Sequence, residues 1–482
     1  MRLDQVLPGA APAGARDLEI TDLAYDNRLA GPGTLFFCVV GYTRDGHDFA
    51  ADAVARGAVA LVVQRPLELE VPQILVESVR AAMGPAAAAL YGDPTAQLQT
   101  VGVTGTNGKT TSAFLVRALL EADGRATGLL GTVKSVIGGV EHDVQRTTPE
   151  AIDLQWTLRR MVDAGDRACV MEVSSHALAL RRADAIHFAA AIFTNLTQDH
   201  LDFHPTMEDY FNAKRLLFRG SEPPRASVIN VDDPYGARLA AEVDDPITFS
   251  LRGDADYRAA GVQTDRHGSR FSVQTPEGEL SLRSPLRGQF NVYNVLGSLA
   301  AARALGVDGP TCAEAIATAG QVPGRFETVD EGQPFAVLVD YAHTPDSLEN
   351  VLSAARGLTE ARLHVVFGCG GDRDRVKRPM MGKIARRLAD RVIVTSDNPR
   401  SEDPEAIIAE ILQGSGRDVT HDADRQAAIA RAIADARPGD VVVIAGKGHE
   451  QGQEFADGYK IPFDDVTVAR EILRGATVSA AQ

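Results

Sequence analysis

The feature that most constrains this chain is a glycine-rich turn between a predicted buried strand and a predicted helix. The strand covers residues 98–103, the turn 104–111 reads Thr-Gly-Thr-Asn-Gly-Lys-Thr-Thr, and the helix covers 112–121. This order is typical of a phosphate-binding loop, whose backbone N–H groups and helix N-terminus hold phosphate oxygens. Lys109 would reach the terminal phosphates, and the Thr110 hydroxyl would bind Mg²⁺.

The turn departs from the general phosphate-loop pattern at its start. Val103 stands where that pattern has glycine, so the first loop glycine is Gly105. The alternative is a tight β–α turn with an incidental Gly-Lys-Thr. We favour the phosphate loop because the strand and the helix both fall where it requires them.

Length and charge narrow the class of protein. The chain has 482 residues, too many for one core, and a formal net charge of −16, which argues against a general binder of nucleic acid or anionic membranes. Its cysteines are scattered, residues 1–21 lack a secretion signal, and no run of about 18 apolar residues occurs. We therefore expect a reduced, cytoplasmic protein that does not span a membrane.

The hydrophobic pattern predicts an α/β protein of three domains, at 1–97, 98–327 and 328–482. The first boundary is the Gly-Asp-Pro turn at 92–94. Short alternating runs at 248–290 predict a small β-rich insertion in the central domain. The remaining predicted strands are 35–40, 58–63, 168–173, 188–194, 336–340, 363–367, 391–395 and 440–445, with helices at 50–56, 81–90 and 289–305. Alternating strands and helices in the third domain predict a doubly wound sheet.

Polar residues follow the predicted central strands. Glu172 ends one strand and His200 follows the next, so both could meet Mg²⁺ together with Thr110. Glu172 is the more natural ligand because Mg²⁺ prefers oxygen. Lys214 lies in a helical run, where the pattern alone favours an exposed lysine.

The third domain has polar loops after its predicted strands, at 340–346, 367–373, 397–400 and 446–450. Each loop alone could be an ordinary surface turn. Several of them at the carboxyl ends of neighbouring strands favour one shared site. Arg400 offers a planar fork suited to a carboxylate, and Pro399 restricts the direction of its loop.

Taken together, the motifs resemble those of the Mur ligases, in order and spacing across almost the whole chain. The segments that carry the resemblance are Thr104–Thr111, Glu172–His176, Thr194–His204, Asn291–Asn294 and Asp340–Asp346. Asp397–Arg400 and Gly446–Glu450 further resemble the branch of this family that adds diaminopimelate.

The resemblance implies an N-terminal α/β UDP-sugar-binding domain, a central P-loop ATPase domain and a C-terminal Rossmann-like domain that binds the amino acid. It also implies a monomeric, ATP- and Mg²⁺-dependent ligase of cytoplasmic peptidoglycan synthesis. A carboxylate of the UDP-sugar peptide would be phosphorylated by ATP, and an amine would then attack the acyl phosphate.

The resemblance also assigns residues around ATP and the metal. The metal would lie among Thr110, Glu172, His200 and Lys214, the last as a carbamylated lysine, and Lys109, His200 and Lys214 would be catalytic. Asn294, Arg325 and Asp340 would hold ATP together with the loop residues Gly105, Thr106, Asn107, Gly108, Lys109, Thr110 and Thr111.

For UDP-MurNAc-L-Ala-D-Glu, the family positions fall on Tyr25, Asn27, Tyr42, Thr43, Arg44, Thr147, Thr148, Ser174 and Arg182. This chain departs from relatives at Asn27, where serine is usual, at Leu180, where some have glutamine, and at Arg146, which replaces an asparagine. These departures bear on individual polar contacts with the UDP-sugar peptide, and not on the site as a whole.

For meso-diaminopimelate, the family positions fall on Arg373, Asp397, Asn398, Pro399, Arg400, Gly446 and Glu450. The distal carboxylate would pair with Arg400, and Glu450 would face the ammonium. L-Lysine lacks that carboxylate and would leave Arg400 buried and unpaired, so we expect diaminopimelate to be preferred.

Two alternatives stay open at this point. A related ligase, such as folylpolyglutamate synthetase or a Mur ligase that adds a different residue, shares the ATP loop and the carbamylated lysine, but should lack the Asp-Asn-Pro-Arg loop. A P-loop kinase or nucleotide-sensing regulator would perform no ligation, and the third domain with its loops argues against it.

Overall fold

The computed structural model describes residues 1–41, 43–144, 146–265 and 267–480, and these form two compact units. The first comprises Met1–Thr104, Gly124–Ala191 and Ala213–Ser227, and the second comprises Gly105–Asp123, Ile192–Asn212 and the chain from Val228 onward. The domain boundaries near residues 97 and 327 stay predictions.

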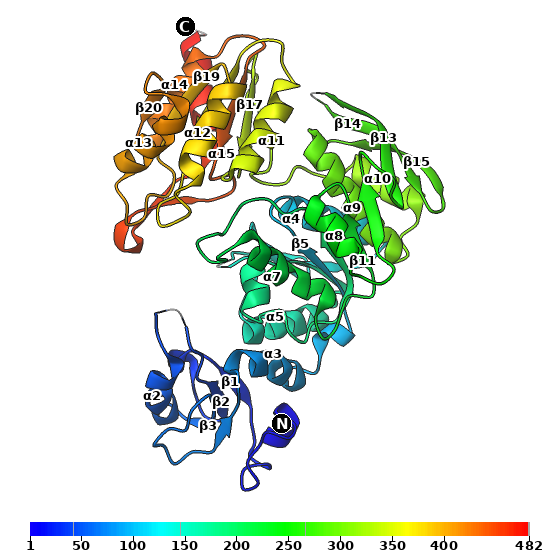
Figure 1. Ribbon diagram of the computed structural model, residues 1–482, viewed down its shortest axis with the longest axis vertical. Coiled ribbons are helices and arrows are strands. Elements are labelled where there is room, and N and C mark those ends of the chain that lie inside the picture. Colours follow the sequence, from blue (N-terminus) through cyan, green and yellow to red (C-terminus); the bar gives the residue numbers. More distant parts are fainter. Residues whose placement is uncertain (42, 145, 266, 481–482) are drawn as a thin grey trace. The chain divides into compact units, whose positions relative to one another are not determined.

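The first unit begins with a parallel sheet of order β1-β2-β3-β4, shown in blue in Figure 1. Helices α1 (Leu3–Val6) and α3 (Val79–Leu90) bury one face of this sheet, and α2 (Ala50–Ala55) buries the other. The strands are Asp22–Ala24, Thr34–Phe37, Ala58–Val63 and Gln73–Leu75. The strand predicted at 58–63 is confirmed, whereas the one predicted at 35–40 already ends at Phe37.

The rest of the first unit contains strands in the order β10-β5-β9-β6-β7-β8. Their bounds are Phe188–Phe193, Gln99–Thr104, Ala168–Glu172, Thr127–Leu130, Ser135–Ile137 and Val140–His142. Strands β5, β9 and β6 are parallel, so Thr104 and Glu172, at their carboxyl ends, lie at one edge. Helices α5 (Ala151–Asp163) and α6 (Ser175–Ala179) belong to the same unit.

The second unit contains helices α4 (Lys109–Ala122), α9 (Gln289–Ala304) and α10 (Gly309–Ala317), which pack on one another. The predicted β-rich stretch at 248–290 is confirmed, since β13, β14 and β15 form an antiparallel meander beside β12 and β11. The strands β11 to β15 are Ser227–Asn230, Ile247–Ser250, Tyr257–Asp265, Gly268–Thr275 and Gly278–Ser284. Helix α8 (Pro234–Ala240) lies between β11 and β12 along the chain. Helix α7 (Met207–Arg219) precedes β11 and belongs to the second unit up to Asn212 and to the first unit from Ala213 onward.

The C-terminal part of the second unit is a sheet of order β16-β17-β21-β18-β19-β20. Its strands are parallel except the edge strand β16. In that order the bounds are Glu327–Val329, Ala336–Asp340, Val441–Ala445, Leu363–Phe367, Arg391–Thr395 and Thr420–Asp422. The four strands predicted here are confirmed to within one residue.

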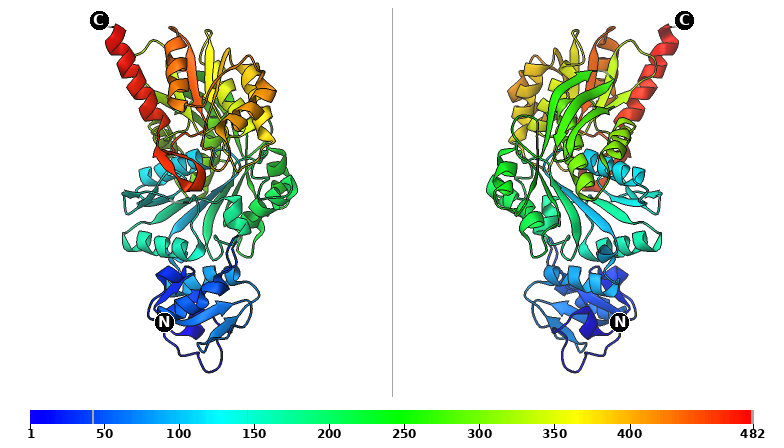
Figure 2. Two further views of the ribbon diagram at one scale, coloured as in Figure 1. Left: turned by 90° about the vertical axis from the view of Figure 1, so that its left-hand side faces the viewer. Right: turned by 90° about the vertical axis from the view of Figure 1, so that its right-hand side faces the viewer.

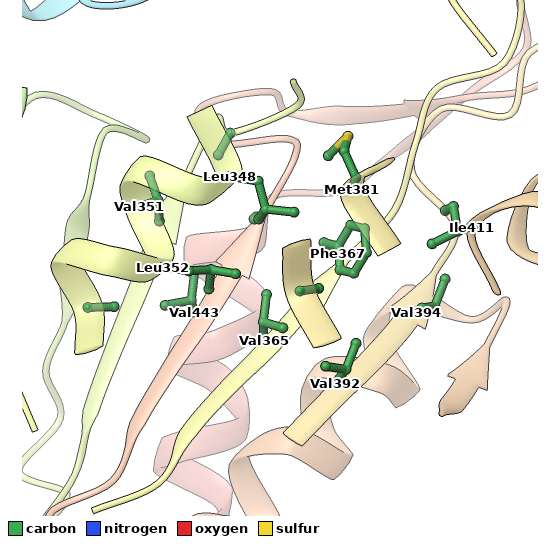
Figure 3. Packing of buried hydrophobic residues seen from close by; sticks show 14 of the residues in the cluster. Leu348, Val351, Leu352, Val365, Phe367, Met381, Val392, Val394, Ile411 and Val443 are labelled. Atoms are coloured by element: carbon green, nitrogen blue, oxygen red, sulfur yellow. The ribbon is translucent and has the colours of Figure 1, made fainter. Parts of the chain in front are cut away.

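Helices cover both faces of this sheet, as the doubly wound prediction requires. Helices α11 (Pro345–Arg356), α12 (Lys377–Leu388) and α13 (Pro404–Ser415) bury Val365 and Phe367 on one face, as Figure 3 shows. Helices α14 (Arg425–Asp435) and α15 (Asp465–Ala480), orange and red in Figure 2, bury Val366 on the other. Successive strand residues point to opposite faces, so strands covered by helices on both sides are apolar throughout.

The parallel strands β17, β21, β18 and β19 are neighbours, so the loops that follow their carboxyl ends lie at one edge of the sheet. These are the loops that the sequence marked as one shared site. Among the described residues, none of the helices combines the length and the apolar character that crossing a bilayer requires.

Candidate active site

The loop between β5 and α4 has the backbone that a phosphate-binding loop needs. Gly105 and Gly108 have φ angles of 151° and 86°, which residues with side chains rarely adopt. A Cβ at Gly105 would overlap the Thr194 hydroxyl, and one at Gly108 would overlap the Asn294 side-chain oxygen. Helix α4 begins at Lys109, so its positive N-terminus follows the loop directly.

A neighbouring segment holds this loop in shape. The backbone N–H of Thr106 donates to the Asn195 carbonyl, and that of Asn107 donates to Asn195 Oδ1, both at 2.9 Å. The Thr194 hydroxyl donates to the Asn107 carbonyl at 2.6 Å. This role of Asn195 was not predicted from the sequence, although the Thr194–His204 motif contains the residue.

The predicted catalytic lysine covers the loop. Lys109 Nζ donates to the carbonyls of Gly105 at 3.0 Å and Thr106 at 2.8 Å, which places a positive charge over the phosphate-binding backbone. Thr110 and Thr111 are buried in the first turn of α4.

Two of the three ATP-binding residues predicted outside the loop contact it directly. Asn294 lies against Gly108, and the Ser112 hydroxyl donates to its Oδ1 at 3.5 Å. Arg325 Nη2 donates to Thr110 Oγ1 at 3.2 Å. The same guanidinium lies 4.4 Å from the centre of the Tyr341 ring, in cation–π contact.

Asp340 lies at the end of β17 and accepts a hydrogen bond of 2.7 Å from the Phe326 backbone N–H. Burial raises the pKa of Asp340 to about 6, although the nearby Arg325 charge opposes that shift. A further link to the loop, from Asn107 Nδ2 to Asp346 Oδ2 at 2.7 Å, was not predicted. The sequence did mark this residue, because Asp346 is the last residue of the Asp340–Asp346 motif.

Two of the predicted metal-site residues belong to the first unit. Glu172 is buried, and its carboxylate accepts hydrogen bonds from the Thr132 backbone N–H at 2.7 Å and the Thr132 hydroxyl at 3.1 Å. Lys214 is 1% exposed and its Nζ donates to Thr104 Oγ1 at 3.4 Å. The pattern-based expectation of an exposed helix lysine is therefore wrong, because α7 turns this residue inward.

The other two, Thr110 and His200, belong to the second unit. His200 has a positive φ of 55°, and its Nε2 lies 3.4 Å from Asp199 Oδ2. Within the described residues, no three His, Cys, Asp or Glu side chains come together as a metal site. Taken singly, the Glu172 carboxylate and the Thr110 hydroxyl are the oxygen donors that Mg²⁺ prefers. This ion is commonly held by one or two carboxylates with substrate phosphates rather than by an all-protein cage.

The first unit contains a cavity of about 460 Å³. Tyr25 and Thr147, both predicted for the UDP-sugar site, line it. Asp26 and Arg28, which flank the predicted Asn27, also line it, as does Asp153, which had no predicted role. Tyr25 donates to Asp153 Oδ2 at 2.6 Å. Of the described residues that line the cavity, none is Asn27, Thr43 or Arg44, and Tyr42 lies outside the described residues.

The predicted substrate residues Thr148, Ser174 and Arg182 form a connected group in the same unit. Thr148 Oγ1 donates to the Glu172 carbonyl at 2.9 Å and to Ser174 Oγ at 3.5 Å, and Arg182 Nη1 donates to the Thr148 carbonyl at 3.4 Å. Arg182 also pairs with Glu150 at 2.8 Å.

Glu150 is a buried carboxylate that forms ion pairs with several arginines. Besides Arg182, it pairs with Arg146 at 2.9 Å and Arg80 at 3.2 Å.

We expect Glu150→Gln to lower the free energy of unfolding by about 2 kcal/mol, because these arginines lose their shared counter-ion. Urea denaturation measures this change. Glu141→Gln is the control, since that exposed glutamate pairs with Lys134 on the surface and should change stability by at most about 0.5 kcal/mol. Equal effects would contradict the expectation.

The predicted amino-acid residues gather at the edge of the C-terminal sheet. Asn398 Nδ2 donates to Glu450 Oε2 at 2.8 Å. Lys447, unassigned from the sequence, is buried and donates to both Asn398 Oδ1 at 2.8 Å and Glu450 Oε2 at 3.1 Å. Gly446, with a φ of 120°, lies against the Asp397 carboxylate. Burial alone would raise the pKa of Asp397, but the charges of Lys447 and Arg425 hold it below its usual range.

Two further residues were predicted for the same amino acid. Arg373 is exposed and its Nη1 donates to the Asp372 carbonyl at 2.9 Å. Arg400 pairs with Glu454, from Nε to Oε2 at 3.2 Å, and its side chain is 22% exposed. The expectation that lysine would leave Arg400 buried and unpaired is therefore wrong, because the chain itself supplies a carboxylate.

Comparison with protein families finds matches along most of the chain. The Mur ligase middle domain matches residues 103–302, the glutamate ligase domain of Mur ligases matches 324–448, and the catalytic domain of the Mur ligase family matches 19–91.

Individual relatives match almost end to end. The chain is 48% identical to UDP-N-acetylmuramoyl-L-alanyl-D-glutamate–2,6-diaminopimelate ligase of Solibacter usitatus, over 95% of this chain and 94% of the relative. It is 47% identical to the ligase of the same name from Streptomyces coelicolor, over 96% and 94%.

Solved structures agree in fold. A structure of UDP-N-acetylmuramoyl-L-alanyl-D-glutamate–2,6-diaminopimelate ligase is 33% identical with a TM-score of 0.72, covering 99% of each chain. A folylpolyglutamate synthase of Mycobacterium tuberculosis, complexed with ADP and AMPPCP, has a TM-score of 0.63 over 77% of this chain and 93% of that one. At 21% identity, this second likeness concerns the fold alone.

Proposed function

The chain belongs to the Mur ligase family, and we propose that it adds meso-2,6-diaminopimelate to the D-glutamyl γ-carboxylate of UDP-MurNAc-L-Ala-D-Glu, with cleavage of ATP, in peptidoglycan precursor synthesis. The proposal rests mainly on contacts, within the second unit, between the phosphate loop and residues that lie far along the chain. Arg325, in the segment before β16, donates to Thr110, and Asn107 of the phosphate loop donates to Asp346, in the first turn of α11 after β17.

The reaction joins a poor acyl donor to an amine. The γ-carboxylate attacks the γ-phosphorus of ATP, the bond to ADP breaks, and an acyl phosphate forms. The neutral amine of diaminopimelate attacks the acyl carbon. Phosphate then leaves from the tetrahedral intermediate, and the amine loses its proton.

The first step brings an anion to an anionic triphosphate, so it needs positive charge at the phosphates. Lys109 supplies part of it from its position over the loop, and the N–H groups of 105–111 supply dipoles. Mg²⁺ would supply the rest of the neutralising charge. The family resemblance assigns Thr110 and Glu172 as oxygen ligands of this ion. Asn294, Arg325 and Asp340 orient the nucleotide.

Lys214 is proposed to act as a carbamate. Its amine adds to the carbon of CO₂ and loses a proton, which turns a cationic side chain into an anionic oxygen donor. His200 is proposed to lie beside the same phosphates. Both roles rest on the family resemblance and on the burial or backbone constraint of each residue.

The UDP-sugar peptide is proposed to lie in the cavity lined by Tyr25 and Thr147. Its acidic end would approach the group of Thr148, Ser174 and Arg182. Asn27, Tyr42, Thr43 and Arg44 are proposed for the uridine end. The proposed working unit is a monomer, which a mass measurement in solution tests.

Diaminopimelate is proposed to bind among Asp397, Asn398, Pro399, Gly446 and Glu450, with Arg373 at the rim. Glu450 would face the distal ammonium, and Arg400 the distal carboxylate. Lys447 and Asn398 hold one oxygen of Glu450 in place.

We expect Arg400→Ala to raise the KM for diaminopimelate about 10- to 100-fold, because a charge-assisted pair is lost. The KM for ATP should not change. Steady-state phosphate release measures both constants. Arg417→Ala, at an exposed arginine of the same domain's surface, is the control and should leave both constants as they are. An unchanged KM for diaminopimelate in Arg400→Ala would contradict this role.

The function itself is tested by phosphate release from ATP in the presence of UDP-MurNAc-L-Ala-D-Glu, with meso-diaminopimelate or L-lysine as acceptor. Release that depends on diaminopimelate is expected. A kinase would release no free phosphate, and a regulator would show no dependence on the acceptor. Either result would overturn the proposal.

A further inference from the structure

The backbone of Arg400 is held by a hairpin that lies more than fifty residues further along the chain. Strands β22 (Gly452–Glu454) and β23 (Lys460–Pro462) pair antiparallel. The Arg400 backbone N–H donates to the Glu454 carbonyl at 3.1 Å, and Arg400 forms a parallel bridge with Phe455. Arg400 also has a positive φ of 52°, so the surrounding contacts impose its conformation.

The side chain of Arg400 is engaged on two sides. Nε donates to Glu454 Oε2 at 3.2 Å, and Nη1 donates to the Gly371 carbonyl at 2.8 Å. The side chains of Arg400 and Glu454 are 22% and 31% exposed, so their pair is only partly screened by water.

We infer that Glu454 is a specificity-determining residue of the amino-acid site, which competes with the substrate's distal carboxylate for Arg400. This inference rests on the proposed function, in which Arg400 binds that carboxylate. Glu454 does not touch the reacting atoms, so it acts through Arg400.

The first consequence concerns the preferred acceptor. A carboxylate binds arginine best through two parallel N–H···O bonds. Glu454 occupies Nε, and Gly371 occupies one N–H of Nη1. Diaminopimelate must therefore displace Glu454 to reach the Nε edge, or share the guanidinium with it, and either event weakens its binding.

The second consequence concerns the acceptor that lacks a distal carboxylate. A site rejects such an analogue strongly when its own polar group is left unpaired. With Glu454 present, Arg400 keeps a partner while L-lysine is bound, so the penalty against lysine is smaller. Glu454 thus reduces the difference in kcat/KM between diaminopimelate and L-lysine, because it weakens the binding of diaminopimelate and lessens the penalty against lysine.

The test compares kcat/KM for meso-diaminopimelate and L-lysine, measured as phosphate release with ATP and UDP-MurNAc-L-Ala-D-Glu. Glu454→Gln keeps the shape and hydrogen-bonding capacity but removes the charge. The matched control is Asp457→Asn, at an exposed residue of the turn in the same hairpin, whose positive φ of 58° asparagine tolerates. Thermal unfolding of each variant is recorded alongside.

We expect Glu454→Gln to raise the diaminopimelate-to-lysine ratio of kcat/KM about fivefold, mainly through a lower KM for diaminopimelate, with the KM for ATP unchanged. Asp457→Asn should leave the ratio unchanged. A ratio that stays the same or falls in Glu454→Gln overturns the inference, as does an equal loss of both activities with a lowered unfolding temperature. No release by the wild type with either acceptor would overturn the proposed function itself.

Discussion

Replacing Lys109 with methionine is expected to lower ATP-dependent phosphate release about 10³-fold. Methionine keeps the length of the side chain and the helical start of α4 but removes the ammonium. In the structure this ammonium is held by the carbonyls of Gly105 and Thr106, over the backbone that would receive the phosphates. Its charge is needed most when a carboxylate attacks the γ-phosphate, so kcat should fall more than ATP binding.

The control for Lys109→Met is Lys383→Met, at an exposed lysine of α12. Its turnover should equal that of the wild type. Losing the hydrogen bonds of Lys109 to the carbonyls of Gly105 and Thr106 should cost only about 1–2 kcal/mol of stability, so unfolding cannot produce the expected loss of turnover. Turnover within tenfold of the wild type in Lys109→Met would show that the loop works without its lysine.

Replacing Lys214 with methionine is expected to lower turnover about 10²-fold or more while ATP binding remains. Lys214 is 1% exposed and adjoins Thr104 at the end of β5, so methionine fills the same space. Lys214→Arg is the informative second variant. Arginine keeps the positive charge but forms no carbamate, so it should be as inactive as methionine.

The carbamate itself can be observed. With ¹³C-labelled bicarbonate, the wild type should show a carbamate resonance that Lys214→Met lacks. Arg219→Met, at the exposed end of the same helix α7, should leave the resonance and the turnover unchanged. If Lys214→Arg kept most of the wild-type turnover, the side chain would act as a cation and the carbamate role would be wrong.

Much of the fold was predictable because the signals are local. The strands at 58–63, 336–340, 363–367 and 391–395 are continuous apolar runs bounded by turn residues, and the structure has them at the same residues. The phosphate loop was predictable for the same reason, since its glycines, lysine and flanking elements are adjacent in the chain.

Lys214 shows where local pattern fails. Its helical run has charged neighbours, which favours an exposed lysine, yet α7 buries it because Tyr210, Phe211, Leu217 and Phe218 turn that side of the helix inward. The family resemblance, carried by distant motifs, pointed to a functional lysine where the local pattern did not.

Which charged side chains pair with one another could not be predicted from the sequence either. Glu150 follows the Thr147–Thr148 pair, and nothing nearby shows that Arg80 and Arg182 approach it. Asn195, Asp346 and Lys447 stood inside recognised motifs, but their contacts depend on how segments that follow separate strands pack together. The contact of Asp346 with Asn107 even joins segments that follow strands of two different sheets.

The sequence by itself determined the elements, the phosphate loop and the kinds of residue that the site contains, because these depend on neighbours along the chain. Only the tertiary structure decided which groups pair. Arg325 reaches Thr110, Asn107 reaches Asp346, and Glu454 reaches Arg400 across long stretches of chain. The first two pairs join segments that adjoin strands of two different sheets, and the third forms beside the carboxyl end of β19. No pattern of neighbouring residues records such contacts, because they depend on how distant parts of the chain pack.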